Sequence, residues 1–129
     1  MALITFIVED NKTIRDNLIP TLEDLANAAV VGVAETEAEA IEWLEAHRGE
    51  WHLAVVDLFL KQGSGLGVLA ACRTRNEQQR VVVLSNYATP EMKSRCTRLG
   101  ADAVFDKSND LDAFFDYCNR DRPSQFSPL

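Results

Sequence analysis

Short runs of consecutive apolar residues alternate along this chain with longer segments in which apolar residues recur every three or four positions. Runs of this length without polar alternation are typical of strands covered on both faces. They occupy Leu3–Val8, Ala28–Val33, Leu53–Val56, Val81–Leu84 and Ala103–Phe105. Because the segments between them have the period of amphipathic helices, the pattern predicts five β–α units, and hence an α/β fold with helices on both faces of a parallel sheet.

The five helical segments are marked by apolar residues at helical spacing, and their boundaries by Gly and Pro. The apolar sets are Ile14, Leu18, Leu22 and Leu25; Ala38, Ile41 and Leu44; Leu66, Leu69 and Cys72; Met92, Cys96 and Leu99; and Leu111, Phe114, Phe115 and Cys118. Gly49 and Gly100 follow two segments, and Pro90 suits the first turn of the fourth. We expect one domain over residues 1–121 and a flexible C-terminal tail over residues 122–129.

Composition narrows the class of protein. The 129 residues carry a formal net charge of −7, which argues against a surface for nucleic acid. No apolar stretch is long enough to span a membrane, and no basic leader precedes the first run, so we expect a cytoplasmic protein without a membrane partner. Cys72, Cys96 and Cys118 lack metal-ligand spacing, and we interpret them as reduced thiols in the core.

Polar residues gather at the ends of four of the predicted strands. In an open α/β sheet, ligands bind beyond the carboxyl ends of the strands, where the strand order reverses. The first strand ends in Glu9 and Asp10, the third in Asp57 and the fourth in Ser85, and the fifth runs into Asp106 and Lys107. The second ends in Gly32-Val33-Ala34, which offers no chemistry. In the order 2-1-3-4-5, the four strands that end in these polar residues lie next to one another.

These side chains form a coherent site for phosphoryl transfer. Three carboxylates brought together repel one another, and Mg²⁺ relieves that repulsion while keeping a position for a phosphate oxygen. Asp57 is a plausible nucleophile because carboxylates form acyl phosphates. Lys107 offers a positive charge and Ser85 a hydroxyl donor. Taken singly, each has an ordinary structural explanation as a cap, loop or solvated residue; their arrival together at matching strand ends favours the site.

The motifs that carry these residues resemble the receiver domain of bacterial response regulators in two-component systems. They are Val8-Glu9-Asp10-Asn11, Val55-Val56-Asp57-Leu58, Gly63-Ser64-Gly65, Val83-Leu84-Ser85 and Phe105-Asp106-Lys107. The resemblance covers nearly the whole chain. It implies a flavodoxin-like, five-stranded parallel sheet of order 2-1-3-4-5.

The same resemblance assigns roles to the strand-end residues. Asp57 would accept a phosphoryl group from a histidine kinase or a histidine phosphotransfer protein. Glu9 and Asp10 would hold Mg²⁺ together with Asp57 and the main-chain carbonyl of Phe59.

On this reading the phosphate acts through two further positions. Ser85 and Lys107 would bind the phosphate, and movement of Ser85 would let the aromatic ring of Phe105 turn inward. The face formed by the fourth helix, fifth strand and fifth helix would then change and meet a downstream target or a second copy. Met92, Lys93, Arg95, Phe114 and Tyr117 fall on the segments of this face. The chain would promote only its own phosphorylation and dephosphorylation.

Three positions depart from the usual receiver pattern. Asn86 follows Ser85 where alanine or glycine is usual, which bears on access to the phosphate. Ser108 replaces a common proline after Lys107, so the cis peptide often found there cannot be assumed from the sequence. Lys61 stands where proline is frequent.

Three other functions share part of this sequence pattern. A haloacid-dehalogenase-type phosphatase needs an acid two residues after its nucleophile, where this chain has Phe59. A flavin- or nucleotide-binding module needs a Gly-rich loop after the first strand, where Glu9-Asp10-Asn11 would repel a phosphate. A receiver-like interaction domain that is not phosphorylated stays open, as does the question whether the chain is a stand-alone regulator or the receiver part of a longer one.

Overall fold

The computed structural model describes residues 2–120 as five parallel strands and five helices in strict alternation. The strands are β1 (Leu3–Val8), β2 (Ala28–Ala34), β3 (Leu53–Val56), β4 (Arg80–Ser85) and β5 (Ala103–Asp106). The helices are α1 (Lys12–Leu25), α2 (Glu37–Ala46), α3 (Gly65–Ala71), α4 (Pro90–Arg98) and α5 (Leu111–Arg120). The observed strand ends lie within one residue of the predicted ones. The predicted tail, 122–129, lies outside the described residues.

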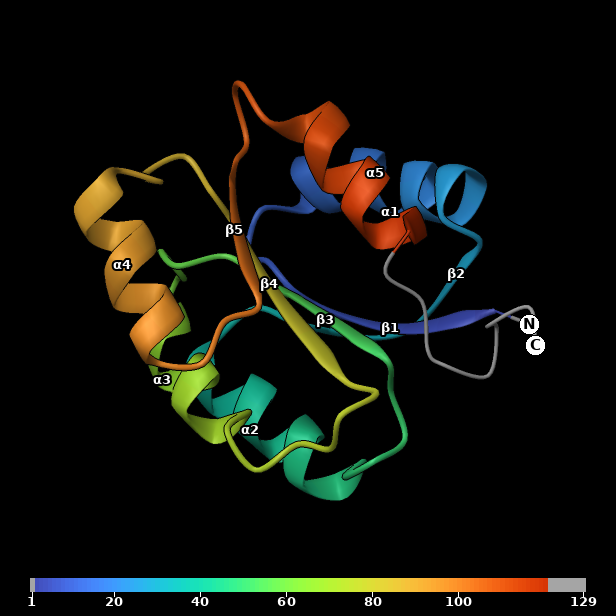
Figure 1. Ribbon diagram of the computed structural model, residues 1–129. Helices are drawn as coiled ribbons and strands as arrows, with labels where there is room; N and C mark the ends of the chain where they lie inside the picture. The colour runs from blue at the N-terminus through green and yellow to red at the C-terminus, as the bar shows by residue number, and fades with distance from the viewer. Residues whose placement is uncertain (1, 121–129) are drawn as a thin grey trace.

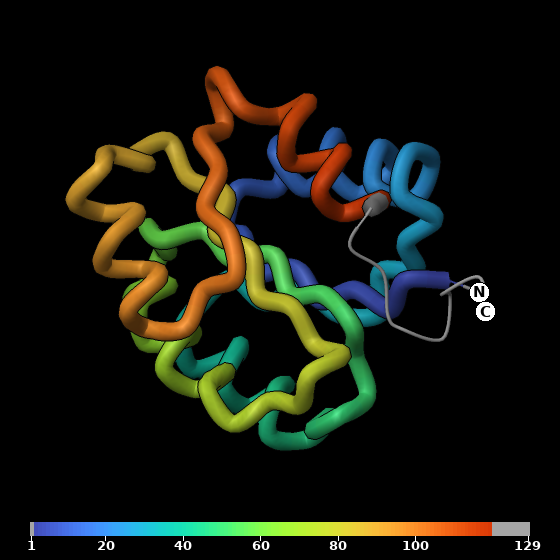
Figure 2. The backbone as a smooth tube through the Cα atoms, in the orientation of Figure 1, coloured from blue at the N-terminus to red at the C-terminus, as the bar shows by residue number. Residues whose placement is uncertain are grey.

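The sheet has the order β2-β1-β3-β4-β5, and every neighbouring pair is parallel. Helices α1 and α5 cover one face of the sheet, and α2, α3 and α4 cover the other (Figure 1). The backbone passes repeatedly from sheet to helix and back, so the loops that follow the strands meet at one edge (Figure 2). The predicted fold class is confirmed. Within residues 2–120, no helix has the length and apolar character needed to cross a membrane.

Apolar side chains pack on both faces of the sheet and form two cores. Along β1, Phe6 and Val8 join the core beneath α2 and α3, whereas Ile7 joins the core beneath α1 and α5. Fully burying one such side chain contributes about 1.5–3 kcal/mol. The edge strand β2 differs from the prediction, since Val31 and Val33 are 52% and 41% exposed. The expectation that every strand is covered on both faces is therefore wrong for β2.

Side-chain caps fix where four of the helices begin. Asn11, Thr36, Ser64 and Thr89 each accept a hydrogen bond from a main-chain N–H in the first turn of α1, α2, α3 and α4, respectively. Pro90 occupies the first turn of α4, as predicted. Because each cap lies in the connection that follows a strand, the caps also hold the loops that carry the polar residues.

His52 links β1 to the start of β3 and makes the stability of the fold depend on pH. Its Nδ1 atom accepts a hydrogen bond from the Ile4 N–H at 3.2 Å, and burial lowers the pKa of its imidazole below 6.5. The unfolded chain therefore binds a proton first, so stability is fully present above about pH 6.5 and is lost as the pH falls toward the folded-state pKa.

We expect His52→Asn to remove this pH dependence, because the Asn Oδ1 atom keeps an acceptor near the position of Nδ1 but does not titrate. The measurement is urea unfolding of both proteins at about pH 7.5 and about pH 5.5. His47→Asn, which leaves His52 in place, is the matched control. An equal loss of stability on acidification in wild type and His52→Asn would contradict the assignment.

Candidate functional site

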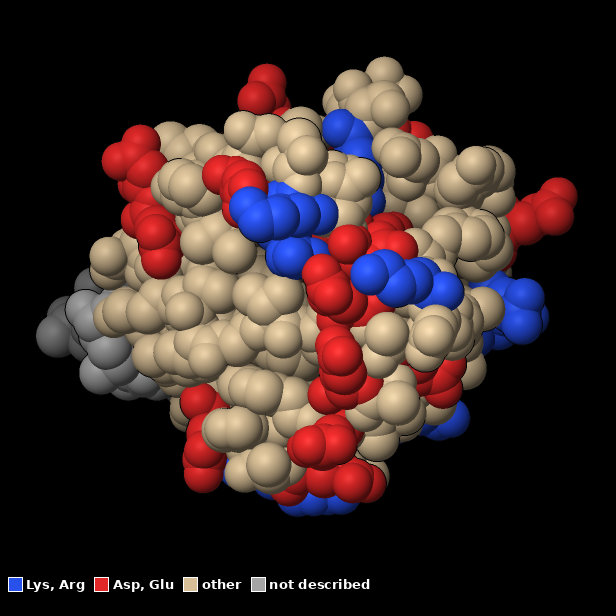
Figure 3. Space-filling view, turned by 180° about the vertical axis from the view of Figure 1, so that it is seen from behind, with Lys and Arg blue, Asp and Glu red and all other residues tan. Residues whose placement is uncertain are grey.

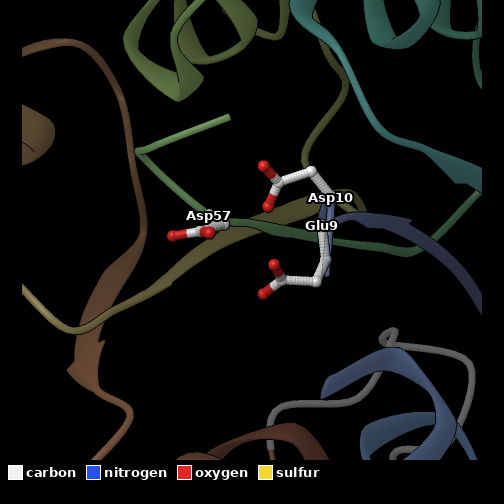
Figure 4. A group of neighbouring side chains, drawn as sticks. All are labelled: Glu9, Asp10 and Asp57. Atoms are coloured by element: carbon white, nitrogen blue, oxygen red, sulfur yellow. The ribbon is translucent and has the colours of Figure 1, made fainter. Parts of the chain in front are cut away.

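Three carboxylates meet where β1 and β3 end. Glu9 and Asp10 follow β1, Asp57 follows β3, and oxygen atoms of the three lie within 4.8 Å of one another. Their carboxyl groups extend to the same side of the strand ends (Figure 4). Glu9 and Asp57 are buried and Asp10 is half-buried. The structure thus brings together the three acidic residues that the sequence placed at a metal site.

Lys107 reaches this cluster from the loop after β5. Its Nζ atom lies 2.6 Å from Glu9 Oε1 and 3.3 Å from Asp57 Oδ2, and its side chain is only 11% exposed. Burial raises the pKa of the Glu9 carboxyl; the hydrogen bond from Lys107 opposes this rise, and the charge of Asp57 adds to it. One lysine cannot neutralise three carboxylates, so the cluster keeps an excess of negative charge that a cation would stabilise.

The donor set fits a hard divalent cation. Carboxylate oxygens are the ligands that Mg²⁺ prefers, and a half-buried Asp10 leaves one side of the cluster open to water or phosphate. The fourth predicted ligand, the main-chain carbonyl of Phe59, lies two residues beyond Asp57, where Phe59 forms an isolated antiparallel bridge with Ser64. That ligand stays a prediction.

The loop after Asp57 is held by glycines and by a residue that sequence reasoning missed. Glu37 Oε1 accepts a hydrogen bond from the Ser64 N–H at 2.8 Å. The Gly65 N–H donates to the Leu58 carbonyl at 3.0 Å, and a Cβ atom on Gly65 would overlap with the Asp57 carbonyl oxygen. The Gly63-Ser64-Gly65 motif signalled this tight packing, but no pattern in the sequence linked it to Glu37.

The phosphate-binding and switch candidates lie on the adjacent strands β4 and β5. Ser85 is fully buried; its Oγ accepts the Tyr87 N–H at 3.1 Å, and its carbonyl accepts the Lys107 N–H at 3.0 Å. Phe105 pairs with Leu84 in the β4–β5 register and is half-buried, with its ring centroid 5.7 Å from that of Tyr117 on α5. Ser85 is therefore tied to the lysine, and Phe105 packs toward α5.

The departure at Ser108 has a structural consequence. No peptide bond among the described residues is cis, so the Lys107–Ser108 bond is trans. The Ser108 N–H donates to Asp106 Oδ1 at 2.7 Å, a bond that proline could not make. Asp110 Oδ2 accepts the Asp106 N–H at 3.0 Å. This network fixes the turn that presents Lys107.

The other two departures lie on the rim of the site. Asn86 is exposed, and the following Tyr87 packs its ring against that of Phe59, with centroids 4.6 Å apart and more than half of each side chain exposed. Lys61 lies 3.9 Å from Glu35, the residue directly after β2. Glu35 also pairs with Arg15 at 2.9 Å, so this residue links the loop after β2 to α1.

Comparison with known proteins decides the family. A model of the response regulator receiver domain matches residues 5–119. The chain belongs to the response regulator receiver domain family. The receiver is 35% identical over 106 residues to the acid tolerance regulatory proteins ActR of Rhizobium meliloti (strain 1021) and Sinorhizobium medicae (strain WSM419), covering 82% of this chain and 53% of each relative. It thus spans about half the length of these curated relatives.

Solved receiver structures share the fold. A response regulator from Burkholderia pseudomallei, with a phosphorylated aspartic acid, a calcium ion and citrate, superposes with a TM-score of 0.73 at 26% identity, covering 86% of this chain and 63% of that one. The receiver domain of the putative response regulator NarL from Mycobacterium tuberculosis gives a TM-score of 0.75 at 23% identity, covering 92% and 98%. Both support the receiver fold, and the second shows the fold alone.

Charge is unevenly distributed over the surface of this receiver. On the side opposite to the view of Figure 1, acidic side chains gather near the middle of the face and basic side chains border them (Figure 3). The net charge of −7 is thus offset locally by Lys and Arg. This face therefore carries charges of both signs.

Proposed function

We propose that this receiver is a phosphorylation-controlled switch in which Asp57 accepts a phosphoryl group from a histidine kinase or a histidine phosphotransfer protein. The observation that carries the proposal is the position of Asp57, buried between an acidic pair and the ammonium group of Lys107. The family supplies the wider setting, which is phosphorylation-dependent signalling in two-component systems.

Transfer needs little covalent chemistry from the protein beyond the nucleophile. An oxygen of Asp57 attacks phosphorus, the new P–O bond forms as the P–N bond to the donor imidazole breaks, and the imidazole leaves with the electron pair. Glu9, Asp10, Asp57 and the Phe59 carbonyl would hold Mg²⁺, which neutralises charge on the phosphoryl oxygens. Lys107, already 3.3 Å from Asp57 Oδ2, would pair with another of these oxygens.

The phosphorylated relative supports this assignment. The Burkholderia pseudomallei structure carries a phosphorylated aspartic acid together with a divalent cation. In the present receiver, Asp57 lies with Glu9 and Asp10 in a group that fits such a cation. We infer from the two observations that Mg²⁺ is required for modification of Asp57.

The signal would leave through the face formed by α4, β5 and α5. A phosphoryl oxygen would offer Ser85 a new acceptor, and the hydroxyl would turn from its present contact with the Tyr87 N–H. The ring of Phe105 would follow, since its strand is hydrogen-bonded to that of Ser85. Lys93 and Arg95 are exposed on α4 and could contact a partner protein directly. Phe114 is fully buried, so it would contribute through packing on the inner side of α5 and not through contact with a partner.

The proposed partner on this face is a downstream protein or a second copy of the chain. Direct nucleic-acid or membrane contact through this domain is not part of the proposal, and the receiver would act in the cytoplasm. It would promote only its own phosphorylation and dephosphorylation.

The switch predicts a local change in backbone protection. With Mg²⁺ and beryllofluoride, which mimics a phosphoryl group on aspartate, we expect hydrogen exchange to change in the β4–α4 loop, α4, β5 and α5, with α2 as an internal reference. Asp57→Asn should show no change, since it cannot hold the mimic. A wild-type response confined to the loops around Asp57 would contradict the assigned face.

The alternative is a receiver-like interaction domain that is not phosphorylated in normal use. The exposed pair of Phe59 and Tyr87 beside the site offers it a contact surface. The two functions differ in one measurable respect, because only the switch forms a metal-dependent phosphoryl adduct on Asp57.

A further inference from the structure

Arg15 reaches back from the first turns of α1 to the main chain of the acidic loop. Its Nη1 atom donates to the carbonyl oxygen of Glu9 at 2.7 Å and lies 2.9 Å from Glu35 Oε2. The side chain is largely buried, with 14% of its surface exposed. A buried guanidinium bonded to a main-chain carbonyl restricts the orientation of that peptide.

Glu35 is itself anchored, so the arginine has a fixed partner. The Glu35 N–H donates to Glu39 Oε1 on α2 at 2.9 Å, and Glu35 Oε1 lies 3.9 Å from Lys61. Arg15 and Glu35 thereby connect the loops after β1 and β2, and Lys61 extends the chain of contacts to the loop after β3. Two of these three loops, those after β1 and β3, carry the acidic group.

The contact matters most for Asp10. Lys107 and the Asn11 N–H hold the carboxylate of Glu9, and Lys107 also holds Asp57. Within the described residues, no hydrogen bond or ion pair holds the carboxylate of Asp10. Its direction therefore depends on the peptide that joins it to Glu9, and the carbonyl oxygen of that peptide is the atom that Arg15 binds.

We propose that Arg15, oriented by Glu35, is a positioning residue that aims Asp10 at the divalent cation; the inference rests on the proposed function of the acidic group as a metal site. Simple electrostatics gives the opposite expectation. Removal of a positive charge beside three carboxylates should favour cation binding. Weaker Mg²⁺ binding after loss of Arg15 would therefore indicate a positioning role, whereas tighter binding would indicate an effect of its charge alone.

The test is a titration of the chain with Mg²⁺ alone, in which the amide NMR signals of Asp10 and Asn11 report the fraction of chain bound to the ion. We expect Arg15→Gln to weaken Mg²⁺ binding about tenfold, as loss of a residue that orients a metal ligand commonly does. Arg15→Lys keeps the charge but has a shorter, more flexible side chain in place of the rigid guanidinium that carries Nη1, and should fall between Arg15→Gln and wild type. Adding Glu35→Gln to Arg15→Gln should weaken binding little further, since both changes remove the same contact.

Lys12→Gln is the matched control, because it removes the same charge from the same helix at an exposed ion pair with Asp16. It should leave Mg²⁺ affinity unchanged or slightly higher. Wild-type affinity in Arg15→Lys, or affinity equal to or above wild type in Arg15→Gln, would overturn the inference while leaving the metal site in place. Absence of Mg²⁺ binding in wild type itself would instead overturn the proposed function.

Discussion

Replacement of Lys107 by methionine should lower the free energy of unfolding by about 3 kcal/mol in the presence of EDTA, because it leaves buried carboxylates without their cation. Lys107 contacts both Glu9 and Asp57, and all three side chains are almost entirely buried. Addition of Mg²⁺ should recover much of the loss, since the ion supplies charge to the same oxygens. Urea unfolding with and without Mg²⁺ measures both effects.

The loss in Lys107→Met should also shrink on acidification. A carboxyl whose pKa is raised on folding, as that of Glu9 is, binds more protons in the folded state, so stability rises as the pH falls through that raised pKa toward the ordinary value of 4.5. Lys12→Met is the matched control: its ion pair with Asp16 is exposed, and its loss should cost no more than about 0.5 kcal/mol. Equal stabilities of Lys107→Met and wild type in EDTA would show that Lys107 does not neutralise the cluster.

Gly65→Ala should damage both the fold and the site. The added Cβ atom would overlap with the Asp57 carbonyl oxygen and lie 2.8 Å from the Leu58 Cα atom, so the backbone on either side must move. Overpacking of this kind costs about 1–3 kcal/mol. Because the displaced carbonyl belongs to the acceptor residue, phosphorylation of Asp57 should slow more than the loss of stability alone explains.

Gly67→Ala makes the same change two residues further along α3. There the added atom would meet the carboxylate of Glu37, a flexible side chain that can turn aside at the expense of its hydrogen bond from the Ser64 N–H, whereas the backbone need not move. We expect a cost of about 1 kcal/mol from the weakened hydrogen bond, partly offset by the better helix propensity of alanine. Stability from urea unfolding and the rate of adduct formation, measured for both variants, test the comparison. Similar behaviour of the two would contradict the role assigned to Gly65.

The fold and the centre of the site could be predicted from the sequence because both depend on local patterns. Strands buried on both faces are continuous apolar runs, and the sheet order then brings Glu9, Asp57 and Lys107 to one edge. The exceptions are the edge strands: no residue of β5 is fully buried, and two valines are exposed on β2. The run of Ala and Val in β2 matches those of the inner strands, and nothing in the run itself marks the strand as an edge with Val31 and Val33 exposed.

The connections around the site could not be predicted, because they join residues from separate loops. Arg15 pairs with Glu35, and Glu37 with the Ser64 N–H, across 20 and 27 positions. Charged residues at such positions are solvent-exposed in most helices and loops, and only the packing of neighbouring β–α units brings these together. The trans bond after Lys107 is the ordinary form of a peptide bond that does not precede proline, and the turn that follows is held by local hydrogen bonds to Asp106.

The most direct test of the central claim is to locate the phosphoryl group. The chain is incubated with Mg²⁺ and acetyl phosphate, its intact mass is measured, and the modified peptide is sequenced by mass spectrometry. Asp57→Asn, an EDTA-treated sample and Asp102→Asn, a change of the same type at the opposite end of the sheet, are the controls. The switch predicts one phosphoryl group on Asp57, present in Asp102→Asn and absent from the other two. No adduct in wild type, also with a histidine kinase as donor, or an adduct that persists in Asp57→Asn, would contradict it.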